Sequence, residues 1–148
     1  MRTVLALLIT LLAAGLAACS EPLAFLPGGA LNGVATPVPA DWSALANVKT
    51  IQVEFRPSEP YSHNVWGVGI DHDLYIATHG NTRWTPFIAT DPRVRVRVGT
   101  ALYDLTAVSV TDGAERARVA DAYAQKYEIK KDENWVNKGV IFRLDRRQ

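Results

Sequence analysis

Apolar and polar side chains alternate with a period of two along most of the chain after residue 48. The clearest case is 93–98, Arg-Val-Arg-Val-Arg-Val, in which the valines share one face and the arginines the other. Similar runs occupy 49–55, 64–70, 74–78, 101–110 and 139–144. Because successive side chains of a strand point to opposite faces, these runs predict six half-buried β-strands.

A tight turn joins two of these strands. The Asp-His-Asp sequence at 71–73 lies between the runs 64–70 and 74–78, so the two runs are predicted to pair as an antiparallel hairpin. Gly67 and Gly69 remove the side chains from one face of the first strand. Glycines in this pattern indicate a bulge, a bend in a barrel or the close approach of another part of the molecule.

Two helices are predicted between the strands. Thr85 caps a short helix that ends at Asp91, which precedes a proline. Asp112, with Glu115 three residues later, has the spacing of a capping box and opens a longer helix over 114–127. Antiparallel strands with two inserted helices favour a closed or partly closed barrel, since closure removes exposed sheet edges.

The start of the chain has the pattern of an export leader. Arg2 is followed by an uncharged apolar run from Val4 through Ala18, which is shorter than the roughly 20 residues of a membrane-spanning helix. Residues 16–19, Leu-Ala-Ala-Cys, resemble the bacterial lipobox. That resemblance implies a signal peptide over 1–18 and lipid attachment at Cys19, the only cysteine. The alternative is a chance thiol in an ordinary signal or anchor helix.

The residues after the cysteine predict a flexible tether. Segment 19–40 is rich in Pro, Gly and Ala and shows neither helical nor strand periodicity, so the domain is expected to span 41–148. The alternative to a free tether is that its apolar residues pack on the domain or enter the membrane interface; these residues are Leu23, Phe25 and Leu26. In the enterobacterial sorting pattern, an aspartate after the lipidated cysteine favours retention in the inner membrane. This chain has Ser20 at that position, which favours the outer membrane, facing the periplasm.

Composition narrows the range of functions. The chain has 148 residues, 48% of them hydrophobic and 21% charged, as expected for one globular domain. Removing Arg2 with the leader leaves equal numbers of basic and acidic side chains, so no overall charge attracts nucleic acid. The three histidines show no ligand-like spacing, so no metal site is predicted.

Several segments together resemble a known family. They are "VWGVGIDHDLYIAT" (65–78), Trp84, "DPRVRVRVG" (91–99), "YDLTAV" (103–108) and "DAYAQKY" (121–127). This order is similar to the FMN-binding split barrels, which include pyridoxamine-phosphate-oxidase-like proteins and deazaflavin-dependent nitroreductases. The resemblance implies a mainly β fold, a six-stranded antiparallel split barrel with one short and one longer helix. It also implies FMN or a deazaflavin as the cofactor, commonly bound at a homodimer interface.

The resemblance places a cofactor phosphate on one loop and one basic strand. The implied ligand-binding residues are Thr78, Asn81, Thr82, Arg83, Arg95 and Arg97. A guanidinium with hydroxyl or amide donors from a turn suits a phosphate. Other interpretations remain open: a Gly-Asn turn with a solvated arginine for the loop, a charge-protected edge strand for the arginines, and a core position for Trp84.

These observations favour a lipid-anchored cell-envelope protein. Its domain is predicted to be a binding or accessory module for a flavin-like or other small anionic ligand. No side chain stands out as a catalytic acid, base or nucleophile. The alternatives are an FMN- or deazaflavin-dependent oxidoreductase, in which the cofactor carries the hydride chemistry, and a structural envelope lipoprotein without a ligand.

Overall fold

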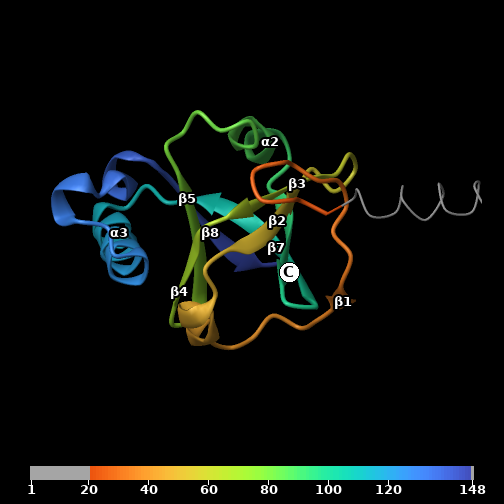
Figure 1. Cartoon of the computed structure of the whole chain (residues 1–148), viewed down its shortest axis with the longest axis horizontal. Helices are drawn as coiled ribbons and strands as arrows, with labels where there is room; N and C mark the ends of the chain where they lie inside the picture. Colours follow the sequence, from red (N-terminus) through yellow and green to blue (C-terminus); the bar gives the residue numbers. More distant parts are fainter. Residues whose placement is uncertain (1–20, 148) are drawn as a thin grey trace, which may run out of the picture.

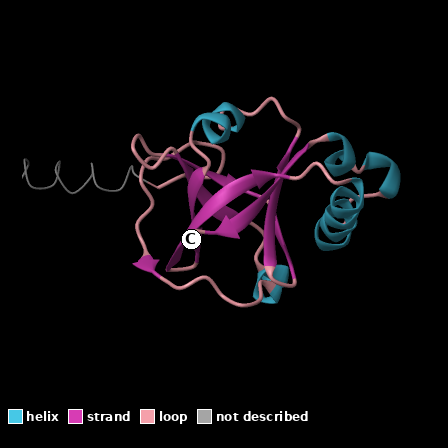
Figure 2. Cartoon of the chain, turned by 180° about the vertical axis from the view of Figure 1, so that it is seen from behind, coloured by secondary structure: helices cyan, strands magenta, loops and turns pink. Residues whose placement is uncertain are grey.

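The computed structural model describes residues 21–147, which form a curled antiparallel sheet with helices outside it (Figures 1 and 2). The strands are β1 (Val34–Ala35), β2 (Ile51–Phe55), β3 (Tyr61–Val65), β4 (Gly67–Ile70), β5 (Asp73–Thr78), β6 (Arg93–Val98), β7 (Ala101–Ser109) and β8 (Val140–Arg146). The α-helices are α2 (Thr85–Thr90) and α3 (Gly113–Tyr127). Three 3-10 helices are η2 (Ser43–Asn47), η3 (Lys131–Glu133) and η4 (Trp135–Lys138).

The strand order confirms a mainly β, antiparallel split barrel. The sheet runs β3-β2-β6-β7-β8-β5-β4, all neighbours are antiparallel, and β1 pairs in parallel with β7. The predicted hairpin is present as β4 and β5. Eight strands are formed where six were predicted, because β1 lies in the expected tether and because the run 64–70 is divided at Trp66 into β3 and β4.

Trp66 is the corner at which the chain passes from one end of the curled sheet to the other. Val65 pairs with β2, whereas Gly67 pairs with β5. The backbone at the corner finds partners on α3: the Trp66 carbonyl accepts a hydrogen bond of 2.8 Å from the Tyr123 hydroxyl. The Gly67 N–H donates to the Tyr127 hydroxyl at 3.0 Å. The long helix therefore satisfies the polar groups that the strand break releases.

Close packing explains the two glycines of β4. A Cβ added at Gly69 would lie 2.3 Å from the carbonyl oxygen of Trp42, and one at Gly67 would lie 2.8 Å from the Ile51 side chain. Of the explanations that the sequence allowed, close approach of another segment therefore applies. The absence of a side chain at Gly69 lets Trp42, the N-cap of η2, pack directly on β4, and its absence at Gly67 leaves room for Ile51 of β2.

Two hydrophobic clusters lie on opposite faces of the sheet. One fills the barrel and includes Phe55 and Trp84, whose rings stack at 4.8 Å. The core position considered for Trp84 is thus confirmed. The other cluster lies under α3, which packs outside the barrel (Figure 1). The buried hydrophobic residues described by the structure lie between Leu31 and Leu144, so a chain beginning at Ser20 keeps this whole core.

Helix capping agrees with the sequence for one helix and differs for the other. The Asp112 side chain accepts from the Glu115 N–H at 2.8 Å, as the capping-box spacing predicts. The N-cap of α2 is Trp84, not Thr85, and it forms no side-chain cap. The Thr85 hydroxyl bonds instead to the Thr82 hydroxyl at 2.6 Å, so it is not used as a cap.

The described part of the predicted tether, 21–40, lies along the barrel rather than apart from it (Figure 1). Leu31 is buried, and its N–H donates to a Glu54 carboxylate oxygen at 2.6 Å. Glu21 forms an ion pair with Arg97. Composition alone predicts flexibility here because the partners of this segment lie on strands far away in the sequence. Within residues 21–147, none of the helices has both the length and the apolar character needed to cross a bilayer.

Candidate functional site

A groove opens at the split of the barrel, between β3 and the end of β5. It has a volume of about 200 Å³ and is open to solvent along one side. We call it the split groove; its lining includes Asn64, Trp66, Thr78, His79, Thr82 and Trp135. Two of the predicted ligand-binding residues, Thr78 and Thr82, are therefore in one cavity.

The two threonines form a small hydroxyl cluster at this groove. Thr78 is almost fully buried, and its hydroxyl donates to the Thr82 hydroxyl at 3.4 Å. Between them the chain turns at Gly80, whose φ of +97° is a conformation that glycine adopts without strain. The turn folds the loop back on the strand end, so the side chains at 78 and 82 meet. These hydroxyls can donate to an anionic group or to a carbonyl oxygen.

The other two loop residues of the predicted set are exposed. Asn81 and Arg83 flank Thr82 on the solvent side of the loop. Neither Asn81 nor Arg83 lines the groove, although each is adjacent in sequence to Thr82, which does.

Arg95 and Arg97 are held elsewhere, on the outer face of β6. Arg95 donates to both carboxylate oxygens of Glu54, at 2.9 and 2.7 Å, and this hydrogen bonding raises the pKa of Arg95. Arg97 donates to the Gln52 side chain at 2.6 Å and pairs with Glu21. The structure does not bring these two arginines together with the loop.

The strand that carries these arginines is not an edge strand. β6 lies between β2 and β7, so the edge-strand interpretation is wrong. Antiparallel pairing aligns Glu54 with Arg95 and Gln52 with Arg97 across the two strands. The arginine side chains therefore form ion pairs and hydrogen bonds with side chains of the neighbouring strand, and they do not protect an open edge.

Aromatic rings form the walls of the split groove. Trp66 stacks on Tyr127 with ring centroids 4.2 Å apart, and His79 lies over Trp135 at 4.3 Å. Trp66 and Trp135 were not identified from the sequence as groove residues. The only indication of a groove residue in the sequence was that Trp66 directly precedes the glycines of β4. Flat apolar walls beside a few hydroxyls suit a small planar ligand with a polar group.

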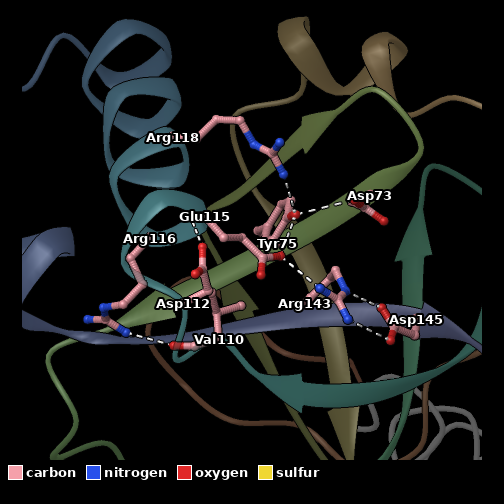
Figure 3. Close-up of polar contacts among 9 residues, drawn as sticks. All are labelled: Asp73, Tyr75, Val110, Asp112, Glu115, Arg116, Arg118, Arg143 and Asp145. Carbon is pink, nitrogen blue, oxygen red and sulfur yellow. Dashed lines mark hydrogen bonds and ion pairs between the residues drawn. The ribbon is translucent and has the colours of Figure 1, made fainter.

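A second polar cluster, outside the barrel, has a structural role (Figure 3). The buried Tyr75 hydroxyl donates to Glu115 at 2.9 Å, and Arg143 donates to the same carboxylate at 2.8 Å. Burial, and then the bond to Glu115, raise the pKa of Tyr75 to about 12. This phenol therefore stays protonated well above neutral pH. The cluster ties α3 to β5 and β8.

Alkaline pH offers a test of this cluster. The folded-state pKa of Tyr75 is about 12 and its unfolded value is 10.0, so the unfolded chain loses the proton first as the pH rises above 10. The free energy by which the protonated Tyr75 stabilises the folded chain is therefore fully present below pH 10 and is lost between pH 10 and pH 12. The loss is about 1 kcal/mol at pH 11. Urea unfolding at pH 9 and pH 11 should show a smaller loss for Tyr75→Phe than for the unchanged chain. Equal losses would contradict the assignment.

Comparison with known proteins gives similarity at the level of the fold. No protein-family model matches the chain, and no curated protein matches its sequence. Among solved structures, a conserved hypothetical protein from Mycobacterium tuberculosis superposes with a TM-score of 0.58 at 18% identity, over 70% of this chain and 76% of its own.

Two further solved structures carry names that mention a ligand or an activity. A FAD-binding protein from Mesorhizobium loti gives a TM-score of 0.53 at 15% identity, over 70% of this chain and 85% of its own. A protein from Listeria innocua is described as a candidate pyridoxamine 5'-phosphate oxidase. It gives a TM-score of 0.54 at 12% identity, over 70% of this chain and 88% of its own. At these identities the likeness shows the fold alone, and it confirms the split barrel expected from the family resemblance.

Proposed function

We propose that this protein is a lipid-anchored binding module whose split groove holds a small planar ligand with an anionic group, with flavins as the first class to test. The observation that carries the proposal is the Thr78–Thr82 hydroxyl pair beneath the aromatic walls of Trp66 and Trp135. Hydroxyls and the nearby Arg83 suit the anionic group, and the rings suit a planar one. The name of the FAD-binding protein with a similar fold supports this choice of ligand.

The fit to a flavin mononucleotide is good at the loop and incomplete at the ring. Thr78 and Thr82 supply donors for a phosphate, Arg83 next along the loop would add a guanidinium, and the tryptophans supply flat surfaces. The groove volume of about 200 Å³ is below the roughly 300–1,000 Å³ of pockets that enclose a ligand of this size. One wall is therefore still needed, and a second copy of the chain is the partner we propose for it.

The oxidoreductase alternative uses the same groove. A bound flavin or deazaflavin would supply the hydride chemistry, while this chain would bind the phosphate, orient the ring and exclude water from one face. Two histidines line the groove, His63 and His79, and His79 is stacked on Trp135. We assign no side chain of the groove as an acid or base, so we place binding ahead of catalysis.

The anchor is proposed from the sequence. Cys19 lies outside the described residues, and the described chain begins at Glu21, two positions later. Ser20 favours the outer membrane over the inner one, and the domain would then face the periplasm. Metabolic labelling with a radioactive fatty acid should mark the protein, and Cys19→Ala should abolish the label. A label that persists in the variant would refute lipid attachment at this residue.

Ligand titration tests the groove. The chain from Ser20 to Gln148 is purified, its visible spectrum is recorded, and FMN and a reduced deazaflavin are titrated by fluorescence. Binding tighter than about 1 mM, equivalent to about 4 kcal/mol, is expected for at least one of them. If both bind more weakly than that, the flavin proposal and its oxidoreductase alternative both fail.

Arg83→Ala tests the phosphate position within the groove. Losing a hydrogen bond to a charged group should weaken FMN binding by about 1.5 kcal/mol, or roughly tenfold. Arg93→Ala is the matched control, because it removes the same charge from an exposed arginine that pairs with Asp91. Equal affinities for the Arg83 variant and the unchanged chain would remove the loop arginine from the site.

A further inference from the structure

An exposed apolar turn lies close to the start of the described chain. Leu23, Phe25 and Leu26 are 61%, 92% and 66% exposed, although all three are large hydrophobic residues. They fall within four consecutive positions, so their side chains form one patch. Scattered single apolar residues are normal on a protein surface, whereas a cluster such as this one indicates a covering partner.

The turn has a defined shape. The Leu23 N–H donates to the Leu26 carbonyl at 3.1 Å, and the Leu26 N–H donates back at 2.7 Å. Ala24 between them has a φ of +48°, which is uncommon for a residue with a side chain. The Asn64 side chain donates to the Ala24 carbonyl at 3.2 Å and so ties the turn to β3. Hydrogen bonds on both sides hold the apolar side chains outward.

The electrostatics of the segment permit an apolar contact. Glu21, the first described residue, pairs with Arg97, so these two charges neutralise each other at the base of the turn. Next along the chain, the Gly28 N–H donates to the Ser62 carbonyl at 2.9 Å and the Ser62 N–H donates back at 2.8 Å. The backbone on either side of the patch is therefore already bound to the barrel, and the turn between them carries no charged side chain.

The position of the turn indicates what covers it. Cys19 precedes Leu23 by four residues, so an acyl chain at Cys19 would keep the turn within about 14 Å of the lipid surface. We propose that the turn 23–26 inserts its apolar side chains into the membrane interface and fixes the orientation of the barrel on the bilayer. This inference rests on the lipid anchor of the proposed function, and it adds a second, non-covalent contact with the lipid.

The orientation has a consequence for the split groove. Asn64 lines the groove and also donates to the backbone carbonyl of Ala24 in the turn. A docked turn would therefore hold this wall of the groove next to the lipid surface.

The experiment uses an anchor that does not depend on lipid attachment. The chain from Ser20, which retains the whole core, carries an N-terminal hexahistidine tag bound to nickel-chelating lipid in vesicles of phosphatidylethanolamine and phosphatidylglycerol. Without Cys19 the chain has no thiol, so Phe25→Cys gives one site for an environment-sensitive NBD label. Val108→Cys is the control, because Val108 is also an exposed apolar residue, on β7.

The expected result is a blue shift of NBD emission at position 25 on the vesicles, with quenching by doxyl lipids, and neither effect at position 108. A label at 25 that stays in water overturns the proposal, as does an equal response at both positions. Circular dichroism verifies that each labelled chain is folded. A negative result here, together with a normal acyl label on Cys19, would reject the docked turn and leave the lipid anchor standing.

Removing the apolar groups gives an independent readout. Without the tag, Phe25→Ser/Leu26→Ser should lower partition into the same vesicles at least tenfold, since two large apolar side chains can no longer enter the membrane interface. Equal partition of the two chains contradicts the proposal. Sedimentation without lipid tests whether a second copy of the chain, instead of the membrane, covers the turn. If the unchanged chain is an oligomer and the double variant is a monomer, a second copy covers the turn and the proposal fails.

Discussion

Gly69→Ala should lower the free energy of unfolding by about 3 kcal/mol, the largest effect that we expect from adding a single methyl group to this protein. The new Cβ would lie 2.3 Å from the carbonyl oxygen and 2.5 Å from the Cβ of Trp42. Overpacking a core commonly costs about 1–3 kcal/mol, and more when the neighbour cannot rotate away. Here the neighbour is backbone, held by a hydrogen bond from the Trp42 N–H to the Asp71 carbonyl at 2.9 Å.

Urea unfolding followed by tryptophan fluorescence measures this effect. Gly113→Ala is the matched control, because a Cβ at Gly113 meets nothing within 4 Å and the residue begins α3. The control should be neutral or slightly stabilising, since alanine favours a helix by up to about 1 kcal/mol over glycine. If the two variants had equal stability, the close packing of η2 on β4 would not exist in solution.

Local patterns in the sequence predicted most strands because each strand contains its own signal. The alternation in 93–98 placed Val94 and Val96 in the core, and both are fully buried on β6. The corner at Trp66 carried no such signal, since the period of two continues through it. Its cause lies on α3, where hydroxyl groups 57 and 60 residues away bind the backbone of the corner. A partner so distant in sequence cannot be predicted from a local pattern.

The difference between local patterns and partners far away in sequence also explains which residues of the candidate site were predicted. The family resemblance led to Thr78 and Thr82 because a strand and the loop after it are continuous in sequence. It grouped them with Arg95, although three steps in the strand order separate β5 from β6. The alternation over 49–55 predicted a half-buried strand, yet Glu54 on its polar face is 0% exposed because segment 21–40 covers it. The covering segment has no periodicity, so its position could not be predicted from its residues.

Arg95→Met should lower the free energy of unfolding by about 3–5 kcal/mol, the cost of removing one partner of a buried ion pair. The Glu54 carboxylate has no exposed surface and would keep only the Leu31 N–H among the hydrogen bonds that the structure gives it. A charge transferred from water to such a site is costly unless a countercharge compensates it. Methionine has a similar apolar stem, so the loss would reflect the missing guanidinium rather than missing volume.

A second substitution separates the charge from the packing. In Glu54→Gln/Arg95→Met the neutral amide oxygen can still accept from the Leu31 N–H, and no buried charge remains. The double variant should recover at least about 2 kcal/mol relative to Arg95→Met in urea unfolding. If Arg95→Met unfolded like the unchanged chain while losing affinity for FMN, Arg95 would be a ligand-binding residue. The buried pair, and the position of segment 21–40 above it, make loss of stability the expected outcome because the guanidinium is already engaged by Glu54.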